Sequence, residues 1–286
     1  MSHPVKGVDH VFLMVNDLDE SERRYAALGF TISPRGLHSA AKGTANHTIM
    51  FPDDYFELLG VLRETEGNVN GVKALREKGQ GLHALACRID DAAAAAEALG
   101  ALGIPTVGLG DFSRPVPLPG GKEGVAAFST VQFAPGEAPF GTVFMCQHKT
   151  REAVWLPELL THPNTACGLG GMLALSDDPA ADAPRFARLW AAGAVSESEG
   201  GLKVTTGPNS APLTLMTPAA MAKLYPGIDL SATPKGAFAA LRIKVSDMGA
   251  AAGCLSKAGI PSVKTAAGLA VPPAETCGTV LEFVPA

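Results

Sequence analysis

Apolar runs that end at an aspartate and lead into a helical pattern recur four times along the chain. The runs begin at Val8, Leu82, Met172 and Phe238. The helical stretch after each run closes at a glycine, in turns around Gly29, Gly103, Gly193 and Gly259. A pattern that recurs in this way indicates a repeated structural unit, so we expect four copies of one unit.

The first copy defines that unit. Its opening strand leads to a helix for which Asp17 or Asn16 is the expected N-cap. Two further strand candidates follow, at 44–51 and 55–62, and a Pro-Asp-Asp turn separates them. The first copy therefore reads as strand, helix and three strands, or βαβββ.

The second copy is longer and is followed by a segment of a different kind. Its alanine-rich helix is expected over 90–102, and strands are expected over 125–133 and 141–148. The segment 149–171 has no strand alternation, so we interpret it as a crossover between two halves. The predicted domains are an N-terminal half, residues 1–150, and a C-terminal half, residues 151–286.

One βαβββ unit leaves a face of its sheet uncovered. Two paired units close a curved sheet into a half-barrel, and the concave side of a half-barrel can hold a ligand. The predicted fold is therefore α+β, with four βαβββ repeats paired into two half-barrels. The alternative is an ordinary α+β protein in which the Asp-helix-Gly pattern recurs by coincidence.

Composition narrows the choice of partners and compartment. The net charge is −5 and the sequence has no cluster of basic residues, which argues against binding to nucleic acid. No apolar run approaches the ~20 residues that span a bilayer. The first residues lack the apolar core of a signal peptide, and the five cysteines form no Cys-x-x-Cys pair. We expect a cytoplasmic protein with a small-molecule ligand and with no nucleic acid or membrane partner. The chain has no glycine-rich phosphate loop, so no nucleotide cofactor is expected.

Several short stretches together resemble one known superfamily. They are Asp9-His10-Val11, Gly43 to Thr48, Asp54 to Val61, Phe112 to Pro115, Cys146-Gln147-His148 and Trp155 to Asn164. With these stretches the chain resembles the vicinal-oxygen-chelate superfamily, which includes glyoxalase I, extradiol dioxygenases and bleomycin-resistance proteins, and more closely its glyoxalase-like group. The resemblance implies the half-barrel fold. It also implies either a metal-dependent lyase, isomerase or dioxygenase, or a metal-free binding protein of the bleomycin-resistance type.

The same resemblance implies a metal site in the N-terminal cup. The superfamily holds its metal with residues from the first and last strands of paired units, which here gives His10, Glu57 and His83. Met145 takes the fourth position and is a poor ligand. Two histidines and a carboxylate suit a divalent iron, manganese, zinc or nickel ion. The alternative is that both histidines are ordinary buried residues and that Glu57 pairs with an arginine.

Other polar residues are expected around this cup. Asn46, His47 and Arg114 are candidate substrate-binding residues, because an arginine above a polar pocket suits an anionic substrate. Strand alternation puts Gln147 in the cup, where it would bind substrate, unless the register slips by one and His148 faces the cup instead. Glu57 and His148 are the expected catalytic residues, His148 as a general base.

The C-terminal half retains little of this chemistry. The positions aligned with His10 are Gly170 and Ala240, and only Glu282 remains as a candidate ligand. One carboxylate cannot hold a metal alone. We therefore expect a structural half, or an internal counterpart of the subunit with which shorter members dimerise, and either a monomer or a homodimer.

Overall fold

The computed structural model describes residues 2–286 as mixed helices and strands in two halves. The first unit comprises β1 (Val8–Val15), α1 (Leu18–Ala27), β2 (Gly36–Leu37), β3 (Thr44–Met50) and β4 (Tyr55–Val61). After α2 (Val69–Lys78), the second unit comprises β5 (Gly81–Arg88), α3 (Ala92–Ala101), β6 (Thr106–Leu118), β7 (Lys122–Phe133) and β8 (Thr142–His148). A short 3₁₀ turn, Pro119–Gly121, joins β6 to β7.

The second half repeats this order. A crossover with two 3₁₀ turns (Arg151–Ala153 and Pro157–Leu159) leads to it. The third unit comprises β9 (Ala166–Leu175), α4 (Pro179–Ala187), β10 (Ala194–Ser198), β11 (Gly201–Thr205) and β12 (Leu213–Met216). After α5 (Pro218–Leu224), the fourth unit comprises β13 (Phe238–Val245), α6 (Met248–Ala258), β14 (Val263–Lys264), β15 (Leu269–Val271) and β16 (Val280–Pro285).

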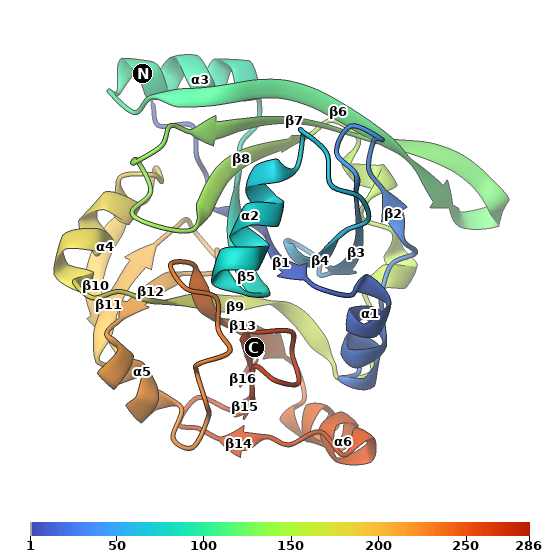
Figure 1. The fold of residues 1–286 in the computed structure, drawn as a ribbon, viewed down its shortest axis with the longest axis vertical. Coiled ribbons are helices and arrows are strands. Elements are labelled where there is room, and N and C mark those ends of the chain that lie inside the picture. The colour runs from blue at the N-terminus through green and yellow to red at the C-terminus, as the bar shows by residue number, and fades with distance from the viewer. Residues whose placement is uncertain (1) are drawn as a thin grey trace.

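Each half forms one eight-stranded curved sheet (Figure 1). The strand orders are β2-β3-β4-β1-β5-β8-β7-β6 and β10-β11-β12-β9-β13-β16-β15-β14, which is one topology used twice. The predicted fold of four βαβββ repeats in two half-barrels is therefore confirmed. The crossover is shorter than expected, because β9 already begins at Ala166. Helices α2 and α5, which join the units within each half, were not predicted.

An aspartate caps the first helix of every unit. The side chains of Asp17, Asp91, Asp178 and Asp247 accept hydrogen bonds from backbone N–H groups of the first helical turn. This satisfies donors that a helix start leaves unpaired. In the second unit the cap is Asp91 and not Asp90, one residue later than the sequence pattern indicated. That single residue shifts the alignment of the two N-terminal units.

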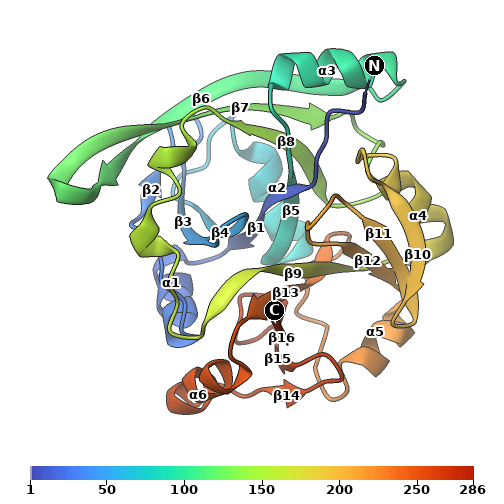
Figure 2. The same ribbon diagram turned by 180° about the vertical axis from the view of Figure 1, so that it is seen from behind.

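The outer faces of the two sheets pack against each other and form the main core. Figure 2 shows β1 and β5 of the first sheet lying against β9 and β13 of the second. Val11 and Leu85 from the first sheet share one buried cluster with Met172 and Leu241 from the second. The packing leaves the concave face of each sheet turned away from the other half.

The two concave faces are filled differently. Crossover residues such as Val154 pack against Tyr55 and Phe128 at one end of the first cup. In the second cup, Met221 and Tyr225 from α5 and its C-cap pack on the sheet itself. The first half therefore keeps an open cup, whereas the second half covers its own.

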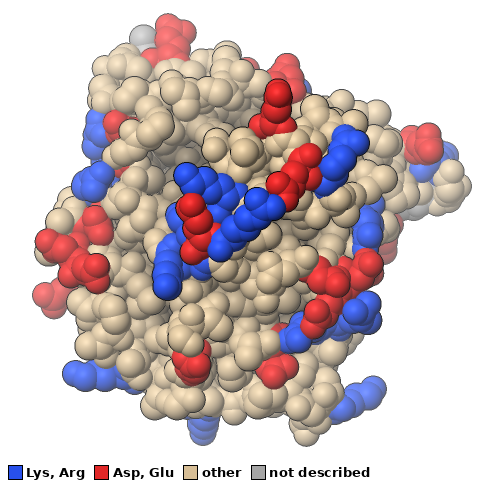
Figure 3. Space-filling model, viewed as in Figure 1, with Lys and Arg blue, Asp and Glu red and all other residues tan. Residues whose placement is uncertain are grey.

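No helix among residues 2–286 has both the length and the apolar character needed to cross a membrane. On the face shown in Figure 3, acidic and basic side chains are interspersed, and a mixed group near the centre lies over α2. Ion pairs such as Lys73 with Glu77 and Arg76 with Glu64 account for part of that mixture.

Candidate active site

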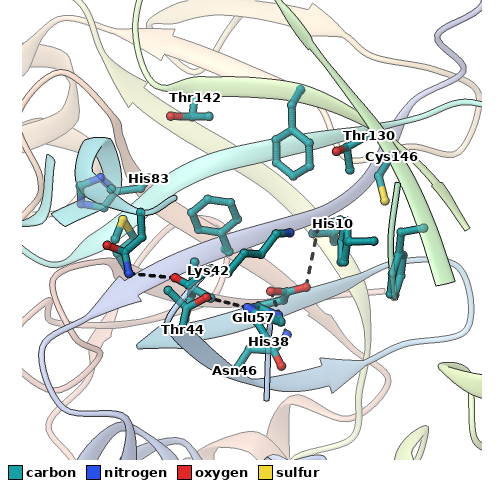
Figure 4. A pocket seen from close by; sticks show the side chains of 18 of the residues that line it. His10, His38, Lys42, Thr44, Asn46, Glu57, His83, Thr130, Thr142 and Cys146 are labelled. Atoms are coloured by element: carbon teal, nitrogen blue, oxygen red, sulfur yellow. Dashed lines mark hydrogen bonds and ion pairs between the residues drawn. The ribbon is translucent and has the colours of Figure 1, made fainter. Parts of the chain in front are cut away.

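A cavity of about 480 Å³ lies between the concave face of the first sheet and α2. Figure 4 shows polar side chains at one end of it, around His10 and Glu57, and His83 at the other end. The polar lining includes His10, His38, Lys42, Thr44, Asn46, Glu57, Arg114, Thr130 and Gln132. Phe12, Phe112, Phe128 and Phe144 supply much of the apolar lining. A concave space of this size, with apolar walls and polar groups that converge at one end, is typical of a small-molecule site.

A β-bulge at Asp9 brings two neighbouring side chains to the same site. Val8 pairs with Cys87 and His10 pairs with Ala86, so Asp9 has no partner on β5. A bulge of this kind re-aims the extra side chain. The Asp9 carboxylate Oδ2 consequently lies 2.8 Å from His10 Nδ1, although adjacent strand residues normally point to opposite faces.

Asp9 Oδ2 also lies 2.9 Å from Nε2 of His148. Burial by itself would raise the pKa of Asp9, but the hydrogen bonds and charges of His10 and His148 hold it well below its usual range. An ionised carboxylate can only accept, so both histidine nitrogens must donate. The neutral tautomer of His10 that can donate to Asp9 carries its proton on Nδ1 and leaves Nε2 as an acceptor. The ring stacks on Tyr55, with centroids 4.4 Å apart, which fixes its plane.

Glu57 is the second acidic group of the site. It lies on β4 beside β1, and its Oε1 is 3.9 Å from Nε2 of His10. Asn46 on β3 donates from Nδ2 to Glu57 Oε2 at 3.1 Å. A carboxylate and an imidazole acceptor thus face the same end of the cavity.

Cationic and neutral nitrogen groups surround Glu57. Burial lowers the pKa of Lys42, which Glu57 partly offsets, and Lys42 Nζ lies 3.4 Å from the centroid of the Phe112 ring. Burial lowers the pKa of His38 to about 4, so His38 is neutral at physiological pH. Arg114 on β6 also lines the cavity. This end of the cavity suits an anionic ligand.

Gly36 on β2 makes room for two of these side chains. A Cβ at Gly36 would lie 2.5 Å from Asn46 Oδ1 and 2.7 Å from an Arg114 guanidinium nitrogen. Contacts this short do not occur, so any larger residue would displace Asn46 or Arg114. The glycine therefore permits the close approach of β2 to the site.

Of the eight predicted site residues, five line the cavity, with His83 at its far end, and three do not. His10, Glu57, Asn46 and Arg114 all line the cavity. His47 points to the opposite face of β3, where its Nδ1 donates to Ser33 O at 2.8 Å and its Nε2 lies 3.5 Å from Glu22. Strand alternation explains this placement, because His47 follows the cup-facing Asn46. His47 therefore does not face the cavity.

Gln147 is also outside the cup, and the register question on β8 is answered in favour of His148. Gln147 Oε1 accepts from the backbone N–H of Ala92 at the start of α3, while Met145 is buried in the core between the sheets. Cys146 and His148 take the other face. His148 is wedged against Phe128 and Trp155 behind His10, so it does not line the cavity as a general base would.

The expected convergence of His83 with His10 and Glu57 does not occur. Leu13 pairs with Leu82 and Phe12 with Ala84, so His83 is itself the extra residue of a second bulge. Its Nε2 bonds Gly79 O at 2.6 Å, at the far end of the cavity. The structural counterpart of His83 is Asp9. The sequence alignment paired His83 with His10 because it took Asp90 as the helix cap.

The positions that correspond to His10 and Glu57 in the second unit carry no ligands. Ala84 pairs with Thr142 as His10 pairs with Tyr55, and Phe144 pairs with Ala86 as Glu57 pairs with Phe12. The four places from which the superfamily holds its metal are therefore His10, Glu57, Ala84 and Phe144. Two of four cannot coordinate, so the residues present do not fit a four-ligand metal site at the centre of the cup.

A different cluster has the spacing for an ion. Ligand atoms of Asp9, His10, Cys146 and His148 lie within 4.8 Å of one another. It is the only such group of three or more within residues 2–286. Burial raises the pKa of Cys146 well above its usual range, so this thiol is not a thiolate. Both histidines donate to Asp9, whereas Nδ1 of His148 is buried without a hydrogen-bond partner among residues 2–286.

Sequence reasoning missed Asp9, Lys42 and Tyr55. Asp9 belongs to the Asp-His-Val stretch that carried the family resemblance, but alternation places it away from the cup, and only the bulge reverses this. Lys42 lies just before β3, where no strand periodicity assigns a direction. The Tyr55 contact with His10 depends on the parallel pairing of β1 and β4, which is a long-range feature.

Comparison with solved structures shows the same architecture elsewhere. A hypothetical protein from Staphylococcus aureus matches with a TM-score of 0.67 at 14% identity, over 98% of this chain and 99% of that one. A xylose isomerase-like TIM barrel/4-hydroxyphenylpyruvate dioxygenase fusion protein matches with a TM-score of 0.59 at 15% identity, over all of this chain and 50% of that one. At these identities the matches show the fold alone.

At the level of sequence, no curated protein matches the chain. Residues 8–192 match the family of glyoxalase-like domains. That range contains all of the first half-barrel, with the cavity and its bulge at Asp9, and the start of the second. The match agrees with the repeat order, the sheet topology and the resemblance that the motifs carry. The chain therefore belongs to the glyoxalase-like domain family.

Proposed function

We propose that the first cup is the active site of an enzyme that transfers a proton on a small, anionic, oxygenated molecule. The observation that carries this proposal is the orientation of His10. Its Nδ1 is bonded to the buried Asp9 carboxylate, and its Nε2 acceptor faces the cavity 3.9 Å from Glu57. An oriented imidazole next to a carboxylate is a recurrent arrangement for general acid–base chemistry.

The chemistry follows from these positions. Nε2 of His10 takes a proton from the substrate, and Asp9 stabilises the imidazolium that results. Lys42 and Arg114 offset the negative charge that then develops on the substrate oxygen. Return of the proton to another atom gives an isomerisation, and loss of a leaving group gives a lyase reaction. Glu57 is placed to carry the second proton.

Solvent-exchange measurements test the proposal. In D₂O, wild-type protein should catalyse incorporation of deuterium next to the carbonyl of some members of a panel of 2-oxo and 2-hydroxy acids, followed by proton NMR. His10→Asn should slow that exchange by about 10²- to 10⁴-fold, because it removes the base without removing the cup. An exchange rate that His10→Asn leaves unchanged would contradict the assignment of His10.

A metal-dependent reaction is the second candidate, and the cluster of Asp9, His10, Cys146 and His148 is the observation that favours it. A bound ion would act there as a Lewis acid. Asp9 and the two histidines would have to give up their mutual hydrogen bonds to hold it. Elemental analysis of protein purified without a chelator or an affinity tag distinguishes the two candidates. Stoichiometric metal that Asp9→Asn removes would favour the second.

A further inference from the structure

Two units place a carboxylate at the same position of the unit. Glu57 lies on the last strand of the first unit, opposite Phe12 on β1. Glu282 lies on the last strand of the fourth unit, opposite Arg242 on β13. When the two halves are compared strand by strand, β16 corresponds to β8, so the two carboxylates lie on opposite sides of their cups. Because the units share one strand order, the surroundings of Glu282 show how a unit satisfies a carboxylate at that place.

In the second cup the protein satisfies the carboxylate with its own side chains. Glu282 is fully buried, and it accepts from the Tyr225 hydroxyl at 2.8 Å and from Arg242 Nε at 2.6 Å. Thr265 donates to the other oxygen. The ring of Tyr225 lies in the apolar cluster of this cup, beside Leu173. The chain thus fills its second cup with a phenol whose hydroxyl bonds the carboxylate.

The first cup lacks such an internal occupant. Among residues 2–286, Asn46 alone donates a hydrogen bond to Glu57, through Oε2. A cavity of about 480 Å³ remains in front of Glu57, and phenylalanine rings line it. A carboxylate with unused acceptor sites in a mostly apolar cavity favours a ligand that donates to it.

We propose that the first cup binds an aromatic hydroxy compound whose hydroxyl donates to Glu57, as the Tyr225 hydroxyl donates to Glu282. The ring lies among Phe12, Phe112 and Phe144, and Lys42 and Arg114 hold an anionic substituent where the ligand has one. This inference rests on the proposed function in one respect, because it takes the first cup as the binding site. What it adds is the chemical class of the ligand.

The test uses 4-methylphenol, which reproduces a tyrosine side chain, and 4-methylanisole, which has the same ring without a donor. Binding of each is titrated by NMR on wild-type protein. A hydrogen bond to a charged group is worth about tenfold or more in affinity, so 4-methylphenol should bind at least about tenfold more tightly. In Glu57→Gln this preference should fall below about threefold. The matched change Glu282→Gln, in the closed cup, should leave the preference intact.

Three results would overturn the inference. They are equal binding of the two probes, a preference that survives in Glu57→Gln, and no saturable binding of either probe at millimolar concentration. The amide spectra of both variants show whether each is folded. A failure of the proposed function is recognised separately: 4-methylphenol would still bind with its preference, while no deuterium exchange depends on His10. If deuterium exchange depends on His10 but 4-methylphenol binds no more tightly than 4-methylanisole, only the assignment of the ligand class is wrong.

Discussion

Asp9 is the side chain on which the arrangement of the candidate site depends. One buried carboxylate oxygen accepts from His10 at 2.8 Å and from His148 at 2.9 Å. Because the carboxylate accepts from both, the two histidines are held in fixed tautomers behind and beside the cavity. Neither the Asp-His-Val motif nor the pattern of the strand contains this information.

Replacing Asp9 should therefore cost stability as well as function. Asp9→Asn keeps the shape but loses the charge that both histidine N–H groups bond. Hydrogen bonds to charged groups contribute roughly 1.5–3 kcal/mol, so the free energy of unfolding at pH 7 should fall by about 2 kcal/mol in urea denaturation. Asp90→Asn is the control, because Asp90 is exposed and pairs only with Lys6 at the surface. Equal stability of the two variants would show that the Asp9 contacts contribute nothing.

At the residue scale, the sequence predicts which residue types matter better than where they point. His10, Glu57, Asn46 and Arg114 were expected in the cup and line it. His83 was assigned to the same centre and lies at the far end. The error is one residue in the alignment, and one residue reverses the face on which a strand side chain lies.

At the scale of elements, bulges explain why the sequence predicts the strands but not the face of the sheet on which each side chain lies. The first strand of each N-terminal unit has one extra residue, Asp9 on β1 and His83 on β5. A bulge leaves the apolar run of a strand intact but interrupts alternation, so it has no signal in hydrophobic periodicity. Helices α2 and α5 were missed for a different reason. They lie between the units, outside the strand–helix–strand repeat on which the prediction rested.

One turn between β3 and β4 makes the fold sensitive to pH. Asp54 in that turn accepts from the backbone N–H of Leu169 on β9, at 3.0 Å, and so joins the two halves. Burial raises the pKa of Asp54 to about 7, which the Leu169 hydrogen bond partly offsets. The folded state then binds a proton that the unfolded state releases above pH 4. Stability from this group is complete below pH 4 and is lost as pH rises through about 7.

Asp54→Asn should remove that dependence while keeping the acceptor oxygen. Between pH 5 and 7 the free energy of unfolding of wild-type protein should fall relative to the variant, by at most ~1.4 kcal/mol per pH unit. Chemical denaturation at pH 5, 6, 7 and 8 measures this. Asp53→Asn, at the exposed neighbouring position, should follow the wild-type profile. Parallel profiles for wild type and Asp54→Asn would show that Asp54 is ionised throughout.

At the scale of the whole molecule, two copies of one half-barrel differ in what fills their cups. The second cup is closed by α5, and the Glu282 carboxylate inside it is bonded to Arg242 and Tyr225. The lack of ligand residues in the C-terminal repeats predicted a structural half, and the assignment of the site to the first cup stays a prediction. The sequence could not predict that Tyr225 fills the second cup, because Tyr225 lies outside every repeat.

Removing the Glu282 carboxylate from the second cup should lower the stability of the fold and leave ligand binding in the first cup unchanged. Glu282→Gln removes the buried charge that Arg242 Nε bonds, while Glu199 stays 2.7 Å from the other end of the Arg242 guanidinium. A hydrogen bond to a charged group contributes roughly 1.5–3 kcal/mol, so we expect a loss of about 2 kcal/mol. The double change Glu282→Met with Arg242→Met should recover much of it, because the charge then left without its partner, Glu199, is partly exposed. An unchanged melting temperature in Glu282→Gln would contradict this reading of the second cup.

The predicted boundary between the halves, near residue 150, stays a prediction that limited proteolysis tests. The β6–β7 hairpin extends away from the molecule, so thermolysin should cut first at its tip, around 119–122 (Figure 2). The crossover should be cut next. Trp155 Nε1 donates to Phe51 O and His162 bonds Met50 O, and these contacts protect it. A first cut within β1 or β5 would show that the core is misplaced.

The central claim is that Asp9 holds His10 with a free acceptor nitrogen toward the cup. A long-range ¹H–¹⁵N correlation spectrum of histidine-labelled protein at neutral pH measures this directly, with His10→Asn used to assign the signal. The claim predicts that Nδ1 of His10 is protonated and bonded to Asp9, and that Nε2 is unprotonated. A proton on Nε2 with Nδ1 unprotonated would contradict the account, because His10 could then neither donate to Asp9 nor accept a proton from a ligand.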